Sequence, residues 1–277
     1  MKNLVLRTVT GIVFVAVVVA SILLYDVTAV PFFILMLLVA VGGTWEFLKM
    51  TGVLHRWPQT IVTLLLTAFM SVAPMLIIRF ELLGFFFCLI PFLFFFIVLF
   101  AIELFRKEEG SSRLQAVSMF FIPMLWIGIP VFMMGWMISV NMPSVLALFI
   151  IIWLDDTLAY CAGSLFGRHK LCERISPKKT WEGFIIAMVL TVAASVSFSY
   201  IGFFTDAVIW SPLKWMGFAL VVVLFGTLGD LVESMIKRSC GVKDSGNILP
   251  GHGGVLDRFD SILMAVPAAV LYAFVVA

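Results

Sequence analysis

The chain consists almost entirely of long apolar segments joined by short polar connections, and about 20 apolar residues are what a helix needs to span a bilayer. Hydrophobic residues make up 63% of the sequence and charged residues only 12%. Soluble domains have an apolar share of about 45–50% and a charged share of about 25%. The sequence therefore predicts an all-α, polytopic integral membrane protein and excludes an ordinary soluble fold.

About nine transmembrane helices are predicted, in an N-terminal region of five spans, residues 1–140, and a C-terminal region of four spans, residues 141–277. The first apolar run counts as a span because it is too long for a removed signal peptide and lacks a small-residue cleavage site. The predicted spans are residues 4–25, 29–48, 59–78, 83–104, 116–138, 144–165, 182–204, 214–236 and 259–276.

The positions of Lys and Arg predict the orientation, because loops rich in these residues stay in the cytoplasm. With a cytoplasmic N-terminus, the nine spans place sixteen of the eighteen Lys and Arg residues inside and only Arg79 and Lys214 outside. Nine of the sixteen lie in two inner loops, residues 165–181 and 237–258. Removing one span would reverse the side of every later loop, so the charge split supports both the count and the direction.

Two spans carry acids in the half that faces the cytoplasm, Asp155 and Asp156 in the sixth and Asp230 and Glu233 in the eighth. An ionised carboxylate inside a bilayer costs ~2.5–3.5 kcal/mol even on the lenient insertion scale, so it needs a base, a metal or water as a partner. These four acids are therefore candidate functional residues of the two spans.

The acids of the eighth span belong to a longer polar line. Asp230, Glu233, Ser234 and Lys237 are spaced i, i+3, i+4 and i+7, which places them on one helix face. We expect this face to point into the bundle. The structural alternative is that the acids form ion pairs with Lys237, Arg238 and Arg258 and only hold helices together.

The stretch from Gly229 to Asp260 is the most polar part of the chain. Residues 241–254 hold five of the twenty glycines, which suits a backbone that turns sharply and approaches a ligand closely. We interpret it as a loop between two membrane spans. Its charged residues are Asp230, Glu233, Asp244, Asp257 and Asp260, and Lys237, Arg238, Lys243 and Arg258, with His252 between them.

The types of these residues indicate a ligand. Clustered carboxylates without thiols or many histidines suit hard cations, Mg²⁺ above all, which binds through one or two carboxylates plus substrate phosphates. The four cysteines, Cys88, Cys161, Cys172 and Cys240, have no metal-ligand spacing and are expected to be reduced thiols. Acids for a metal and bases for phosphate predict a phosphorylated substrate.

The loop before the seventh span contains SPKKTWEG, residues 176–183. Ser176 and Pro177 suit the N-cap and the first position of a helix. The free N–H groups of that helix start, together with Lys178 and Lys179, would then face an anion. The alternative is a solvated, positively charged loop with no ligand.

These polar blocks follow one another in a long fixed order. They read Asp155-Asp156-Thr157-x-Ala159-Tyr160, Ser176-Pro177-Lys178-Lys179-Thr180-Trp181-Glu182-Gly183, Ser234-x-x-Lys237-Arg238, Lys243-Asp244-x-Gly246, and Leu249-Pro250-Gly251-His252-Gly253-Gly254-x-Leu256-Asp257-Arg258-x-Asp260. The order resembles the phosphatidate cytidylyltransferases, the CDP-diacylglycerol synthases. The first half of the chain resembles that family only as a run of membrane spans.

The resemblance implies a nucleotidyltransferase of phospholipid biosynthesis that converts CTP and phosphatidic acid to CDP-diacylglycerol and pyrophosphate. It implies Mg²⁺, with room for a second cation, and Asp230 and Asp257 as metal ligands supported by Asp260 and Glu233. The partners would be CTP, phosphatidic acid and the lipid bilayer, with no nucleic acid and with a homodimer left open. The site would face the cytoplasm from a bacterial cytoplasmic membrane.

The resemblance also implies roles for the remaining polar residues. The phosphates would be neutralised by Lys237, Arg238, Lys243 and Arg258. The catalytic set would consist of Asp230, Asp257, Lys237, Arg238 and Arg258. His252 would either donate a hydrogen bond to a phosphate or have a structural role. The glycine-rich turn at residues 251–254 would direct backbone N–H groups toward phosphate. The substrate-binding candidates are Asp156, Ser176, Lys178, Lys179, Lys243, Asp244, His252, Gly253 and Gly254.

Two other functions remain open at this point. A CTP-dependent lipid kinase of related architecture would move the γ-phosphate instead, and the length of the motif match argues against it. An ion-coupled transporter would use its intramembrane acids to bind the coupling ion, but the polar residues gather toward one side and no inverted repeat is evident. A CDP-alcohol phosphotransferase is disfavoured because its D-x-x-D-G-x-x-A-R pattern is absent.

Overall fold

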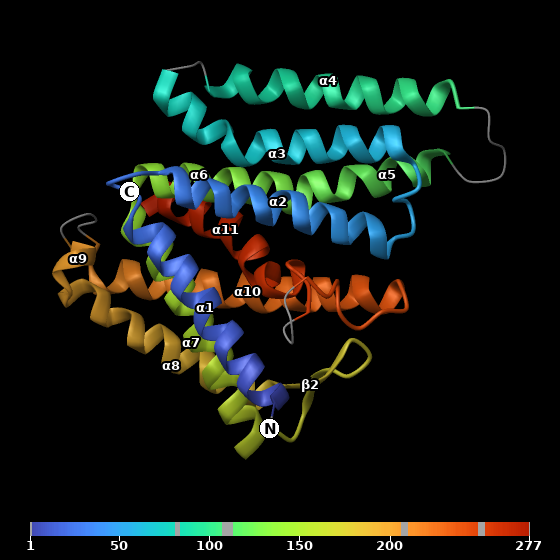
Figure 1. Cartoon of the computed structure of the whole chain (residues 1–277). Coiled ribbons are helices and arrows are strands. Elements are labelled where there is room, and N and C mark those ends of the chain that lie inside the picture. Colours follow the sequence, from blue (N-terminus) through green and yellow to red (C-terminus); the bar gives the residue numbers. More distant parts are fainter. Residues whose placement is uncertain (1, 81–83, 107–112, 206–209, 249–252, 277) are drawn as a thin grey trace. The chain divides into compact units, whose positions relative to one another are not determined.

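The computed structural model describes residues 2–80, 84–106, 113–205, 210–248 and 253–276, and its chain forms two compact units (Figure 1). The first unit contains residues 1–139 and 244–259, and the second contains residues 140–243 and 260–277. The described residues of the segment 244–259 thus group with the N-terminal helices. The predicted regions of five spans, residues 1–140, and four spans, residues 141–277, stay a prediction.

The described part of the first unit is helical. Apolar helices α2 and α4 both pack against α3, and Figure 1 shows α3 alongside α4. Helices α5 and α6 continue one another through the π-helical turn η1, so that residues 117–140 make a single apolar span. The elements are α1 (Lys2–Leu23), α2 (Val30–Met50), α3 (Trp57–Phe80), α4 (Gly84–Leu104), α5 (Arg113–Pro123), η1 (Met124–Gly128) and α6 (Ile129–Val140).

The second unit is built around the packing of α7 against α8 and of α10 against both. A short β-hairpin interrupts the helical sequence between α7 and α8. Its elements are α7 (Met142–Phe166), β1 (Lys170–Cys172), β2 (Ser176–Thr180), α8 (Trp181–Ser195), the 3₁₀ turn η2 (Val196–Tyr200), α9 (Gly202–Thr205), α10 (Pro212–Ser239) and α11 (Leu256–Val276), whose first residues group with the first unit.

Within the described residues, seven helical segments are long and apolar enough to cross a membrane. Two shorter apolar helices, Thr8–Leu23 and Leu89–Leu104, lie in the remaining two predicted spans. The predicted class, a helical integral membrane protein, is therefore confirmed, while the count of nine and the orientation stay predictions. The seven are Val30–Met50, Trp57–Phe80, Val117–Val140, Met142–Phe166, Trp181–Tyr200, Pro212–Ser239 and Leu256–Val276.

The segment from Ser176 to Thr180 is a strand, so the prediction that Ser176 caps a helix is wrong. Lys170 pairs with Thr180 and Cys172 with Ser176 in an antiparallel hairpin. Pro177 fits there because a two-stranded ribbon has only edge strands, where a missing N–H is tolerated. The helix begins four residues later, where Thr180 Oγ1 accepts a hydrogen bond from the Gly183 N–H at 3.2 Å.

The hairpin is tied to the start of α8 by Glu182. Its carboxylate accepts hydrogen bonds from the backbone N–H groups of Arg168, at 3.0 Å, and of His169, at 3.1 Å, and contacts His169 Nδ1 at 2.5 Å. An acid in the first helical turn is also stabilised by the partial positive charge of the helix N-terminus. The hairpin is thus fixed at both its entry and its exit.

Helices α7 and α8 approach each other at glycines. A Cβ atom on Gly183 would lie 2.9 Å from the Ala159 carbonyl oxygen and 3.0 Å from both Gly163 Cα and Thr180 Oγ1. Real Cβ atoms do not come so close to backbone atoms, so any larger residue would push the helices apart. This contact therefore sets where the hairpin, which follows α7 and precedes α8, meets the bundle.

We predict that Gly183→Ala lowers stability by ~1–3 kcal/mol, as overpacking does, and lowers the unfolding temperature in detergent. The matched control is Gly226→Ala in α10, where the nearest atom to a new Cβ is 3.7 Å away and the gain in helix propensity favours alanine. Equal unfolding temperatures for the two variants would contradict the close α7–α8 contact.

Candidate active site

A pocket of about 290 Å³ opens in the second unit among α7, the hairpin, the start of α8 and α10. Its volume is near the lower end of the range of small-molecule sites, about 300–1,000 Å³. Carboxylates, lysines and hydroxyl groups share its wall with a few apolar side chains. The lining residues are Asp155, Asp156, Ala159, Tyr160, Leu171, Ser176, Lys178, Lys179, Thr180, Phe184, Thr227 and Asp230.

The pocket joins three blocks that are distant in sequence. Asp155 and Asp156 come from the sixth predicted span, Ser176 and the two lysines from the hairpin, and Asp230 from the eighth predicted span. The sequence predicted each block separately as a polar site. Their meeting in one cavity is information that only the fold supplies.

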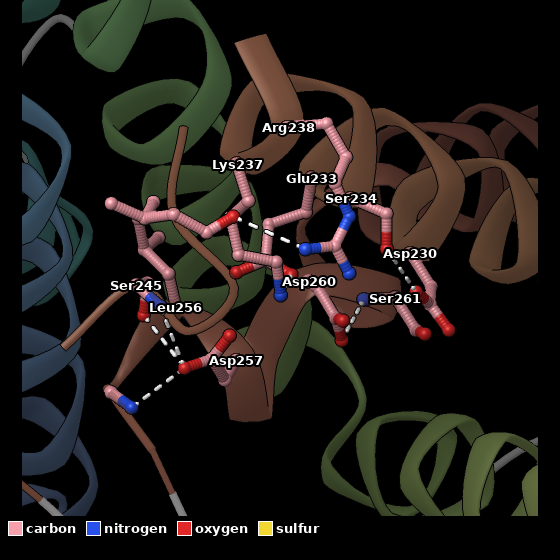
Figure 2. Close-up of polar contacts among 12 residues, drawn as sticks. Asp230, Glu233, Ser234, Lys237, Arg238, Ser245, Leu256, Asp257, Asp260 and Ser261 are labelled. Atoms are coloured by element: carbon pink, nitrogen blue, oxygen red, sulfur yellow. Dashed lines mark hydrogen bonds and ion pairs between the residues drawn. The ribbon is translucent and has the colours of Figure 1, made fainter. Parts of the chain in front are cut away.

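The pair formed by Lys179 and Asp230 connects the hairpin to α10. Lys179 Nζ lies 2.6 Å from Asp230 Oδ2, and the two side chains are 28% and 27% exposed. Ser234 Oγ donates a hydrogen bond to Asp230 Oδ1 at 3.2 Å (Figure 2). Both oxygens of Asp230 are therefore engaged, and water can reach the ion pair from the pocket.

Asp155 and Asp156 differ in exposure although they are adjacent. Asp155 is only 7% exposed, and its Oδ1 is buried without a hydrogen-bond partner in the described part of the chain. Asp156 is exposed to the pocket. Of the two adjacent acids, one is therefore buried behind the pocket wall and the other is open to the pocket.

The predicted polar face of α10 is confirmed by its contacts. Glu233 is fully buried, and its Oε2 lies 2.5 Å from Lys237 Nζ one turn later (Figure 2). Asp260 of α11 lies within electrostatic range of Asp156, Asp230 and Glu233. Four acids of the second unit are thus gathered near α10, and two of them pair with lysines.

Gly229 allows this gathering. A Cβ atom on Gly229 would overlap the Asp260 carbonyl oxygen and lie 3.0 Å from Met264 Cβ and 3.1 Å from Ser261 Cα. The residue before Asp230 must therefore be glycine for α10 and α11 to pack at this distance. Asp260 itself accepts a hydrogen bond from the Ser261 N–H at 2.7 Å.

Asp257 lies in the first unit, where its carboxylate organises the polar loop. Its Oδ2 accepts hydrogen bonds from the Ser245 N–H at 2.9 Å, from Ser245 Oγ at 3.0 Å and from the Gly254 N–H at 2.7 Å (Figure 2). The Gly254 N–H, which the sequence assigned to a phosphate, is thus directed at Asp257. Gly251 and His252 of the expected glycine turn lie outside the described residues.

Sequence reasoning missed Glu46 of α2, which holds the same loop. Glu46 is 2% exposed. Its Oε1 accepts a hydrogen bond from the Val255 N–H at 3.0 Å, and its Oε2 accepts from the Leu256 N–H at 3.0 Å and from Ser245 Oγ at 2.9 Å. The available signal was a single acid near the end of an apolar span, a pattern that by itself suggests function.

The other predicted residues occupy less specific positions. Lys178, Lys243 and Asp244 are exposed. Arg238 donates from Nη1 to the Val242 carbonyl oxygen at 3.3 Å, which steadies the turn after α10. Gly253 has φ of +82°, a left-handed conformation that favours glycine. Arg258 lies in the first turn of α11, where its backbone N–H bonds the Val255 carbonyl oxygen at 3.1 Å.

The donor chemistry fits a hard cation, although the described residues contain no group of three His, Cys, Asp or Glu side chains arranged to hold a metal ion. Mg²⁺ needs only one or two protein carboxylates when phosphates and water complete its shell. Cys161, Cys172 and Cys240 are free thiols, as predicted. Burial raises the pKa of the Cys240 thiol, which disfavours the thiolate that binds soft metals.

The fold and the pocket together define an integral membrane protein whose polar site is lined by acids, lysines and hydroxyl groups. A family profile described as the cytidylyltransferase family matches residues 5–276, and the chain belongs to that family.

Curated relatives match the chain over shorter segments. The phosphatidate cytidylyltransferase of Staphylococcus aureus (strain COL) is 49% identical over 129 residues, which are 47% of this chain and 48% of that protein. The proteins of the same name from Staphylococcus saprophyticus and Staphylococcus haemolyticus are 45% identical over 130 residues and 47% identical over 125. The matched segments cover 48% and 46% of those two proteins, so the chain spans about half the length of the curated relatives it matches.

Proposed function

We propose that the protein is a phosphatidate cytidylyltransferase, which converts CTP and phosphatidic acid to CDP-diacylglycerol and pyrophosphate. The observation that carries the proposal is the single pocket that joins the Asp155–Asp156 pair, the lysines of the hairpin and Asp230. Membership of the cytidylyltransferase family and the names of the relatives support it. An acid- and base-lined pocket in a membrane protein also suits one soluble and one lipid phosphate substrate.

The chemistry requires charge neutralisation and alignment. A phosphate oxygen of phosphatidic acid attacks the α-phosphorus of CTP, a new P–O bond forms, and pyrophosphate leaves with the electron pair of the broken bond. Because the nucleophile is already an anion, no strong general base is needed, and positioning with electrostatic stabilisation supplies most of the rate. Lys178 and Lys179 line the pocket and would neutralise phosphate there. By resemblance, further positive charge would come from Lys237, Arg238, Lys243 and Arg258.

We further propose Mg²⁺ as the cofactor. Asp156 and Asp230 line the pocket and would hold it, while Asp257, Asp260 and Glu233 are the acids that the resemblance adds. The chemistry that Mg²⁺ would supply there is neutralisation of phosphate charge. The ion pair with Lys179 would orient the Asp230 carboxylate, and a bound phosphate would compete for that lysine.

Asp230→Asn is expected to lower turnover by ~100-fold or more, because the amide replaces a charged ligand and breaks the ion pair with Lys179. The matched control is Asp26→Asn, which changes an exposed acid between α1 and α2 and should leave turnover unchanged. Turnover and its Mg²⁺ dependence would be measured on the purified protein in detergent. Near-normal activity of Asp230→Asn would place the metal elsewhere.

The charge split of sixteen to two supports a cytoplasmic N-terminus and a site that faces the cytoplasm of a bacterial cell membrane. In a background without native cysteines, Lys178→Cys is expected to react with a membrane-impermeant maleimide only after the cells are opened. Arg79→Cys, on the opposite side, should react in intact cells. Labelling of Lys178→Cys in intact cells would overturn this orientation.

The fate of labelled phosphorus tests the function itself. Label in the α-position of CTP is expected to enter the lipid product, and label in the γ-position to leave as pyrophosphate. Phosphatidic acid should be required, and diacylglycerol should not replace it. Lipid-bound γ-label with a lipid alcohol would identify a kinase instead, and no transfer of either label to any lipid would favour a transporter.

A further inference from the structure

We propose that Glu46 is a positioning residue for the reaction, which holds Asp257 and the start of α11 in place through Ser245. This inference deepens the proposed function and rests on it, because that function is what gives Asp257 a role. All the contacts that carry the inference lie within the first unit. They connect residues about two hundred positions apart in the sequence.

The environment of Glu46 is unusual for a structural acid. The carboxylate is 2% exposed in a membrane-spanning helix, and in the described part of the chain its hydrogen bonds come from two amides and one hydroxyl, with no Lys or Arg among them. Burying a carboxylate with neutral partners is costly. Such an arrangement is maintained where the acid itself is needed.

The loop is shaped around this carboxylate. A Cβ atom on Gly246 would overlap Glu46 Oε1 and lie 2.8 Å from its Cδ, and a Cβ atom on Gly254 would overlap both Ser245 Oγ and Glu46 Oε2. Two glycines of the polar loop are therefore required by the side chain of Glu46. Neither requirement involves a substrate.

Glu46 reaches Asp257 by two routes. The first runs through Ser245, whose hydroxyl contacts Glu46 Oε2 at 2.9 Å and Asp257 Oδ2 at 3.0 Å. The second runs through the backbone, because Glu46 binds the N–H groups of Val255 and Leu256, the two residues just before Asp257. The position of the Asp257 carboxylate thus depends on Glu46 although the two acids share no direct bond.

The decisive variant is Glu46→Gln, which keeps the size but turns an NH₂ group toward at least one of the N–H donors. Glu103→Gln is the matched control, because Glu103 is an equally buried acid of the same unit, 3% exposed, that pairs with Arg56 and Gln59 away from the loop. Both variants are expected to lower the unfolding temperature. Only Glu46→Gln should affect the loop and the reaction.

Two measurements separate positioning from general stability. At saturating CTP and phosphatidic acid, kcat of Glu46→Gln is expected to fall ~10-fold to ~100-fold with smaller changes in KM, whereas Glu103→Gln keeps kcat at the same temperature. Amide hydrogen exchange at residues 255 and 256 is expected to rise ~10-fold in Glu46→Gln only. Unchanged kcat with faster exchange, or reduced kcat with unchanged exchange, would each overturn the proposal.

Ser245→Ala keeps the inference testable if Glu46→Gln does not fold. It removes the hydroxyl between the two acids while the backbone N–H remains, so kcat should fall ~3-fold to ~10-fold. Where Glu46→Gln folds, the kcat of the double variant should fall by less than the product of the two single effects, because both substitutions act on one network. Additive effects would overturn the Ser245 route.

If the wild-type protein transfers no α-label, the proposed function fails, while the exchange measurement still tests whether Glu46 orders the loop.

Discussion

The burial of carboxylates in an apolar helical bundle is the constraint on which the described structure depends. A buried acid is costly unless donors meet it, because a bilayer core offers no water to replace a missing partner. Glu103 is met by Arg56 at 3.2 Å, and Glu233 by Lys237 at 2.5 Å. Glu46 is met by backbone amides and a hydroxyl.

These solutions have different structural consequences. A lysine or arginine reaches its acid on a flexible side chain, so an ion pair tolerates shifts of the helices that carry it. A backbone N–H has no such freedom, and an acid that binds two successive amides fixes the path of the chain itself. The first kind connects Arg56, just before α3, to Glu103 of α4, and it joins two successive turns of α10. The second kind shapes the loop that leads into α11.

The sequence was sufficient where local spacing decides the structure. Apolar runs predict the spans, and the spacing of Glu233 and Lys237 predicts their pair on one face of α10. Spacing says nothing of Lys179 and Asp230, which are brought together only by the packing of α7, α8 and α10.

Other features required the tertiary structure. Ser176 has the chemistry of a helix cap, but pairing of Cys172 with Ser176 places it in a strand, and Thr180 becomes the cap. Glu46 has no periodic partner in its apolar span, so only the contacts of Ser245, Val255 and Leu256 with α2 reveal its donors. Local propensity therefore failed at Ser176, where a hairpin forms in place of a helix start, and at Glu46, where a distant segment supplies the donors.

The hydroxyl of Ser245 carries a single hydrogen, yet it lies within hydrogen-bond distance of two acids. It can donate to Glu46 or to Asp257, but not to both at once. If a cation binds Asp257 as the proposed function requires, it would reduce the need of that carboxylate for the hydrogen and release it to Glu46. By reciprocity, a stronger hold on the hydrogen by Glu46 would leave Asp257 more open to that cation. The two acids, one from each end of the chain, are thus thermodynamically linked through one proton.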